Sequence, residues 1–197
     1  MKALNKLKFY MTGLLMGALI IGCSSSDDEE PILRDEDEET LSVSELTFSG
    51  AETGRKVGET FVGKATTSDG GYFMTIVLAD EDPDTYVLNI SRMMSQPFNF
   101  APGSHTIPAW TEDDDPTEGF YASLTLTGSS AVYMTYGEET GGTFTIDQRR
   151  TIGGREYVEG NLALTFANLL DNATRVAVQG TFKGFVEDLG VIEVDDD

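Results

Sequence analysis

Two short loops in this sequence crowd carboxylates together, and carboxylate oxygens are well suited to bind a hard cation. The loops cover residues 80–84 and 112–118. Ca²⁺ takes six to eight oxygen ligands, and the first candidates for them are Asp113, Asp115 and Glu118. Neither loop has the ligand spacing of an EF-hand, and water alone can screen the repulsion between the charges. The sequence therefore leaves open a calcium site and a solvated acidic loop.

Histidine and cysteine each occur once, at His105 and Cys23, and this count excludes several kinds of site. A structural zinc site needs several Cys or His ligands, and ligation of haem by two histidines is impossible. A serine or cysteine nucleophile would need His105 as its base, but the preceding residues 102–104 are typical of a turn and the sequence has no Gly-x-Ser-x-Gly elbow. P-loop and dinucleotide-binding fingerprints are also missing. We interpret His105 as a turn residue that is hydrogen-bonded or solvated.

Three aromatic residues are candidates for a ligand site, because an exposed ring with polar groups nearby can stack on a sugar. Trp110 adjoins the second acidic loop, and Tyr121 and Tyr133 fall on the polar phase of their predicted strands. Packing in the core or at a strand edge is the alternative for each. The long apolar loop at residues 93–102 either covers the core or forms a partner surface.

The elements that must position these residues are β-strands. From Val43 onward the hydrophobic pattern has period two, with many glycines, threonines and aromatics and clear turn signals between segments. We expect a single all-β domain at residues 43–187, built as an antiparallel β-sandwich or a Greek-key or meander barrel of about ten strands. The expected strands lie near residues 45–49, 58–66, 72–79, 85–92, 106–110, 119–127, 131–136, 142–148, 157–167 and 175–186.

Alternation in three of these strands predicts which face is buried. The expected inward residues are Phe120, Ala122, Leu124 and Leu126, then Val158, Gly160, Leu162, Leu164 and Phe166, then Val176, Val178, Gly180, Phe182 and Gly184. Their neighbours, Tyr121 and Tyr157 among them, are expected on a wet face. The glycines at 180 and 184 indicate bends or close approach of another strand.

The chain is strongly acidic, with 34 acidic and 13 basic residues and a formal net charge of −21. A nucleic acid or an anionic membrane surface would be repelled, because both bind through clustered Lys and Arg. Acids concentrate in residues 24–40 and 187–197, which lack apolar periodicity. We therefore expect an acidic disordered tether at 23–42 and an acidic disordered tail at 188–197.

The first thirty residues combine a basic start, an apolar run at 9–21 and Cys23. The run is too short to span a bilayer, so it predicts a signal peptide at 1–22. A single cysteine cannot form an internal disulfide, and an unpaired thiol is a liability in an exported protein unless it is used. The two alternatives are a modified Cys23 and a secretory signal with a chance cysteine. Residues 19–23 resemble the lipobox of bacterial lipoproteins. This resemblance implies that Cys23 is the first mature residue and carries a diacylglyceryl group and fatty acyl chains that anchor it in a membrane.

Two further resemblances concern the location and the fold. Residues 24–30, three serines followed by four acids, resemble the surface export signal of Bacteroidota lipoproteins, which implies display on the outer face of the outer membrane; the alternatives are an ordinary acidic linker and a periplasm-facing anchor. The strands at 141–146, 158–166 and 176–182 look like the C-terminal half of β-rich lipoproteins of the same group. That likeness implies the fold class and the location and supplies no activity.

Three functions remain open at this point. The first is a non-enzymatic binding or accessory module that captures a polysaccharide or serves an outer-membrane complex such as a transporter. The second is a surface glycan hydrolase, which would need two carboxyl groups held apart across a sugar and at least one raised carboxyl pKa. The third is a structural or adhesion protein without a pocket. The sequence favours the first, because it contains no catalytic motif and requires no cofactor other than the candidate calcium ion.

Overall fold

The computed structural model describes residues 41–80, 85–111, 114, 119–129, 131–171 and 173–193. The fold is all-β, as the sequence predicts, and every predicted strand is present. The elements are β1 (Val43–Gly50), β2 (Gly54–Thr67), β3 (Tyr72–Asp80), β4 (Val87–Met94), β5 (Gly103–Ile107), β6 (Tyr121–Leu126), the short 3₁₀ helix η1 (Thr127–Ser129), β7 (Ala131–Met134), β8 (Gly141–Ile152), β9 (Arg155–Asn168) and β10 (Arg175–Ile192).

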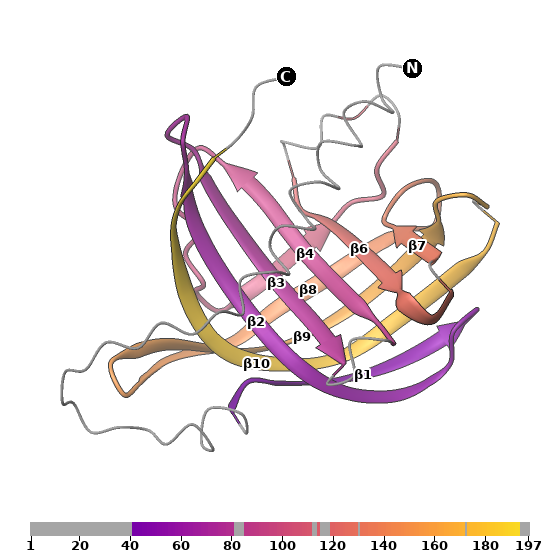
Figure 1. Ribbon diagram of the computed structural model, residues 1–197, viewed down its shortest axis with the longest axis horizontal. Helices are drawn as coiled ribbons and strands as arrows, with labels where there is room; N and C mark the ends of the chain where they lie inside the picture. Colours follow the sequence, from indigo (N-terminus) through magenta and orange to yellow (C-terminus); the bar gives the residue numbers. More distant parts are fainter. Residues whose placement is uncertain are drawn as a thin grey trace. The chain divides into compact units, whose positions relative to one another are not determined.

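The ten strands form one sheet whose pairings return on themselves. The circuit runs β2–β3–β4–β6–β7–β9–β10 and back to β2, with β1 beside β10 and β2, and with β8 and β5 continuing from β9. Figure 1 shows β2, β3 and β4 in one layer that crosses over β8, β9 and β10. Strand β10 joins the layers, because its first part pairs with β9 and β1 and its last part pairs in parallel with β2. The closed circuit is barrel-like and needs no second sheet.

The core lies on the inner side of this circuit, where the predicted alternation holds. Leu124, Val158, Phe166, Val176 and their same-phase neighbours are buried in one hydrophobic cluster. Each fully buried side chain of this size stabilises the fold by about 1.5–3 kcal/mol relative to exposure. The apolar loop at 93–102 covers the core, since Phe100 is buried in the cluster and Phe98 packs against it.

Close approach of β1 explains one of the glycines in β10. A Cβ atom at Gly180 would lie 2.0 Å from the carbonyl oxygen of Glu45 and 2.9 Å from the Cα of Leu46. Both atoms belong to β1, which pairs with β10 through this position. A backbone atom cannot rotate away as a side chain can, so this position requires glycine.

Several predicted strand limits need correction, and the strand predicted at 106–110 is β5, which covers Gly103–Ile107 and ends before Trp110. Strands β8 and β9 continue to a two-residue turn at Gly153 and Gly154, where φ is 56° and 81°, so they extend beyond the predicted ends at 148 and 157. A turn with both φ values positive matches strand twist and lets pairing continue to its tip. A register shift between Ile146 and Gln148 breaks the alternation and conceals this extension in the sequence.

The last strand runs to Ile192, whereas the sequence predicts that the domain ends at 187 and that an acidic tail begins at 188. Val191 and Ile192 pair in parallel with Thr66 and Thr67, beyond a register shift after Asp188. That irregularity and the acids around it hide the strand from a search for period two.

Residues 194–197 lie outside the described residues, as do the predicted signal peptide, Cys23 and the residues of the tether up to 40. Within the part of the chain that the structure describes, no helix has the length and apolar character needed to cross a membrane.

Candidate ligand-binding face

Part of the outward surface of β8, β9, β10 and β1 carries small, uncharged side chains, while Glu45, Glu159 and Lys183 lie further along the same strands. Strand pairing places the uncharged side chains in rows, since Thr143 pairs with Ala163, Ala163 with Gln179, and Gln179 with Thr47. The next row runs from Gly141 through Thr165 and Ala177 to Ser49. We call this surface the hydroxyl face; it comprises Thr47, Ser49, Gly141, Thr143, Ala163, Thr165, Ala177 and Gln179.

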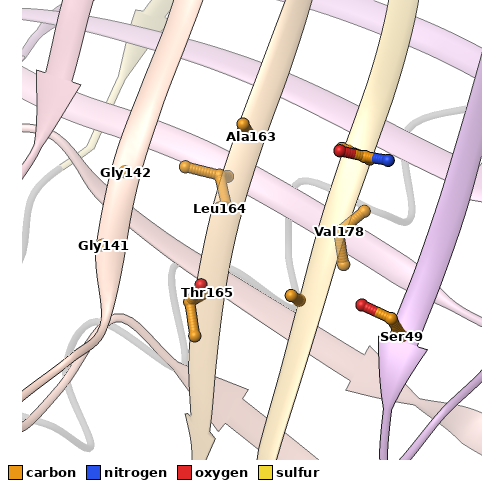
Figure 2. Close-up of a pocket in the computed structure, with 9 residues that line it drawn as sticks. Ser49, Gly141, Gly142, Ala163, Leu164, Thr165 and Val178 are labelled. Atoms are coloured by element: carbon orange, nitrogen blue, oxygen red, sulfur yellow. The ribbon is translucent and has the colours of Figure 1, made fainter.

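A shallow hollow of about 260 Å³ lies in the hydroxyl face. Figure 2 shows that its labelled residues come from β8, β9, β10 and β1. Its lining consists of Ser49, Gly141, Gly142, Ala163, Leu164, Thr165, Ala177, Val178 and Gln179. The glycines and alanines of this lining add little or no side-chain volume above the backbone. The surface is therefore hollow there.

The two glycines of the hollow are fixed by backbone geometry. Gly141 has φ 91° and Gly142 has φ 142°, values that L-residues with a side chain rarely adopt. A Cβ atom at Gly142 would lie 2.1 Å from the carbonyl oxygen of Ala163, and one at Gly141 would lie 2.5 Å from that of Ile107. At the start of β8 the hollow is therefore lined by backbone without side chains, and the segment at 107–109 packs closely on Gly141.

The chemistry of the hollow is that of neutral hydrogen bonds. Ser49 and Thr165 offer hydroxyl groups and Gln179 offers an amide, and each can both donate and accept. None of the lining residues carries a titratable side chain. The hollow can therefore bind a neutral polar molecule, but its own lining cannot supply a general acid or base.

Two charged side chains at the border of the hydroxyl face already form an ion pair or hydrogen bonds. Arg55, which lies beside Thr47 on β2, forms an ion pair and a hydrogen bond with Glu45. At the other end Arg175 donates to the carbonyl oxygen of Glu138 at 3.2 Å. Two basic groups beside the neutral area, Arg55 and Arg175, thus each have a polar partner.

Trp110 does not line the hollow and anchors a loop instead. Its indole N–H donates to the carbonyl oxygen of Phe120 at 3.0 Å, and its backbone forms an isolated parallel bridge with Tyr136. The backbone N–H of Trp110 donates to Thr135 at 2.8 Å, and Gly137 donates to Trp110 at 2.7 Å. The side chain is half-buried.

Tyr121 and Tyr133 are buried, with 8% and 5% exposure, so the expectation that both face water is wrong. Tyr133 pairs with Leu124 and belongs to the hydrophobic core. Tyr121 is on the outward phase of β6, but it pairs with Ser91, which is itself fully buried there. The predicted wet face of β6 is therefore dry at this position. Tyr157 is also buried, against Phe185 with 5.2 Å between ring centroids and with the Arg150 guanidinium 4.9 Å from its ring.

His105 is a strand residue packed among aromatic rings, so its interpretation as a hydrogen-bonded or solvated turn residue is wrong. Its ring stacks on Phe144 with 4.8 Å between centroids, and Phe98 and Phe120 lie at 5.2 and 5.5 Å. The Nε2 atom is buried and has no hydrogen-bond partner among the described residues. Burial lowers the pKa of His105, and the positive charge of Arg92 lowers it further.

Arg92 is a feature that the sequence reasoning missed. Its guanidinium lies 5.0 Å from the centroid of Phe120, and its Nε atom is buried without a hydrogen-bond partner within the described parts of the chain. The sequence did contain a signal for it, because Arg92 has the same phase as the core residues Leu88 and Ile90 in β4.

The predicted calcium ligands Asp113, Asp115 and Glu118 lie outside the described residues. Their neighbour Asp114 accepts hydrogen bonds from the backbone N–H and the hydroxyl of Thr111, both at 2.7 Å. No group of three or more His, Cys, Asp or Glu side chains within the described ranges is arranged to hold a metal ion.

Two carboxyl groups in turns have a shifted pKa, and both shifts are downward. A hydrogen bond from the Thr67 hydroxyl lowers the pKa of Asp69, helped by the backbone N–H of Gly71. The Thr174 hydroxyl does the same for Asp171, helped by the N–H of Ala173. These groups stabilise turns, and a lowered pKa is the opposite of what a carboxylic acid donor in a hydrolase needs.

Comparison with protein-family models, with curated proteins and with solved structures finds no match to this chain. Its function is therefore inferred from its own sequence and geometry.

Proposed function

We propose that this protein is a lipid-anchored binding module of the outer cell surface that captures an uncharged glycan on the hydroxyl face. The observation that carries this proposal is the neutral hollow of about 260 Å³, lined by hydroxyl, amide and backbone groups, in a chain of net charge −21. An uncharged polysaccharide presents many hydroxyl groups and is not repelled by that charge. An anionic polymer would be repelled, because like charges interact unfavourably across distances comparable to the Debye length.

Binding is favoured over hydrolysis by the composition of the hollow. Cleavage of a glycosidic bond commonly uses two carboxyl groups on either side of the scissile bond. The lining of the hollow contains hydroxyl, amide and aliphatic side chains only. A glycan seated there would be held by hydrogen bonds and van der Waals contact without a neighbouring group to protonate its linkage.

The location follows from the resemblance of residues 19–23 to a lipobox. Acyl chains on Cys23 would hold the protein at the membrane, since two or more chains give stable anchoring. The acidic segment at 24–40 could reach at most roughly 60 Å if fully extended, at about 3.3–3.6 Å per residue. The hydroxyl face would then meet polymers outside the membrane surface.

Affinity electrophoresis in gels containing neutral or anionic polysaccharides tests the proposal. We expect a neutral glucan or mannan to retard the protein and alginate to leave its mobility unchanged. Ala177→Tyr places a large side chain in the hollow and should weaken neutral-glycan binding at least tenfold, which corresponds to about 1.4 kcal/mol. Thr151→Tyr is the matched control, because Thr151 is exposed on β8 and does not line the hollow.

The outcome for the two variants decides the location of the site. Equal loss of binding in both variants would point to a general effect of the added tyrosine. Unchanged binding by Ala177→Tyr would exclude the hydroxyl face, and retardation by alginate alone would contradict a neutral ligand.

A further inference from the structure

A row of exposed, uncharged side chains crosses five strands of the sheet and extends beyond the hollow in the hydroxyl face. Register pairing defines this row, which runs over β5, β8, β9, β10 and β1 through Thr106, Thr143, Ala163, Gln179 and Thr47. All five side chains are exposed. We call this set the crossing row. Ala163 and Gln179 in its middle also line the hollow, whereas the threonines on either side do not.

The crossing row presents polar groups at a regular spacing. Neighbouring strands lie about 4.8 Å apart, so residues in register repeat at that distance on one face of the sheet. The three threonines supply hydroxyl groups and Gln179 supplies an amide. Ala163 adds only a methyl group, so the row is lowest where it meets the hollow. The four steps from Thr106 to Thr47 cover about 19 Å.

Charged residues limit the neutral surface more tightly along the strands than across them. On β10 the outward residues Ala177, Gln179 and Thr181 are uncharged, and Arg175 and Lys183 follow at the two ends. The three uncharged positions cover about 14 Å, at about 3.4 Å per residue. The crossing row is uncharged over its whole length and meets a charged register partner on β2, beyond its last residue. The longer uncharged path therefore runs across the strands.

Building on the proposed function, we propose that the hydroxyl face binds an extended, linear neutral glycan that follows the crossing row with about one sugar on each strand. A β-1,4-linked glucan or mannan has the required shape, because each pyranose unit of such a chain advances it by roughly the spacing of neighbouring strands. Successive sugars would then meet successive strands. An α-1,4-linked glucan coils, so few of its consecutive sugars can follow the row.

The composition of the crossing row makes the length of the glycan decisive. The row has no aromatic ring on which a sugar could stack. Each sugar is held by hydrogen bonds between neutral groups, which compete with water and are individually weak. Once one sugar is bound, its linked neighbours lie at high effective concentration over the next strands, so their contacts add. Affinity should therefore increase with each sugar until the five strands are occupied.

Calorimetric titration of the lipidated full chain, in a detergent without sugar headgroups, tests this dependence on length. The ligands are β-1,4-linked cello- and manno-oligosaccharides of two to six sugars. In the series that binds more tightly, the dissociation constant should fall at least tenfold from the disaccharide to the pentasaccharide and less than twofold from there to the hexasaccharide. Maltopentaose differs from cellopentaose in the linkage alone, and it should bind at least tenfold more weakly than the best β-1,4-linked pentasaccharide.

Variants at the ends of the crossing row test its direction. Thr106→Tyr blocks the end on β5, which lies outside the hollow, so it should weaken pentasaccharide binding at least fivefold and leave disaccharide binding unchanged. A chain that ran along the strands would not reach this position. Thr151→Tyr is the control, because Thr151 is exposed on β8 and lies outside the row. Thermal unfolding checks that each variant is folded, and Thr47→Tyr at the opposite end carries the test if Thr106→Tyr is not.

The outcomes separate this inference from the proposed function. Equal affinity for the disaccharide and the pentasaccharide, equal affinity for maltopentaose, or full pentasaccharide affinity in the folded end variants would overturn the crossing chain. A neutral glycan confined to the hollow would survive these results. Absence of binding to every neutral glycan, polysaccharides included, would overturn the proposed function and this inference together.

Discussion

At the scale of single residues, the aromatic surroundings of His105 predict a pH dependence of stability. Burial and the charge of Arg92 hold the folded-state pKa of His105 below its usual value of 6.5. The unfolded chain then binds the proton more readily than the folded chain. The contribution of neutral His105 to stability is therefore complete above pH 6.5. That effect is lost as the pH falls from 6.5 through the folded-state pKa. We expect the free energy of unfolding, measured with denaturant, to decrease across this window.

The variant His105→Phe separates this effect from other titrations. Phenylalanine can occupy the aromatic cluster without titrating, so the variant should show no such decrease below pH 6.5. Asp69 and Asp171 act in a lower window, because their pKa values are lowered from 3.8 and their stabilising effect is lost only as the pH falls toward the shifted values. Identical profiles for the two proteins as the pH falls below 6.5 would contradict this account of His105.

Residue type alone identified few of the residues that matter in the candidate sites. Trp110, Tyr121 and Tyr133 stood out because they are aromatic, yet two are buried and one anchors a loop. Strand register decided their environment, as the pairing of Tyr133 with Leu124 shows. Arg92 could have been found from its inward phase. The residues of the neutral hollow could not, because small alanine and threonine side chains resemble those of any edge strand.

At the scale of elements, the close contact between β1 and β10 predicts that one methyl group added at Gly180 strongly lowers the stability of the fold. Gly180→Ala would place Cβ 2.0 Å from the Glu45 carbonyl oxygen, which forces the two strands apart. We expect the free energy of unfolding to decrease by about 1–3 kcal/mol, the usual range for overpacking. Gly103→Ala is the matched control, because a Cβ atom at this position on β5 would have nothing within 4 Å. Chemical denaturation of both variants measures the difference, and equal midpoints would refute the steric explanation.

The positions of the strands were predictable because the alternation of polar and apolar residues is a local pattern. The order of the strands in the sheet was not predictable from that pattern. Period two in β6, β9 and β10 identified the buried face directly from sequence. Strand β10, however, pairs with β1 and β2, more than a hundred positions away in the chain, and nothing in its local pattern specifies these partners. The same applies to its parallel segment at Val191 and Ile192, where the irregularity after Asp188 separates it from the regular part of the strand.

At the scale of the whole molecule, the described hydrophobic core and the proposed lipid anchor come from different parts of the sequence. Among the residues that the structure describes, the buried side chains of the hydrophobic core come from between Leu46 and Val186. The proposed anchor, Cys23, lies well before the first of them in sequence. In the proposed anchor, two or more acyl chains on Cys23 would account for stable membrane attachment, and a net charge of −21 opposes adsorption to anionic lipid. Removal of the Cys23 sulfur should therefore be sufficient to detach the protein.

Cys23→Ala tests this separation of roles. We expect the variant to leave the membrane fraction for the soluble fraction, while the unfolding temperature and the affinity for a neutral glycan stay those of the lipidated protein. The membrane attachment should also withstand high salt in the unmodified protein, because acyl chains hold it by the hydrophobic effect and not by charge. A variant that remained with the membrane would contradict acylation at Cys23 as the sole anchor. A lowered unfolding temperature would instead contradict the expected independence of folding from the residue at position 23.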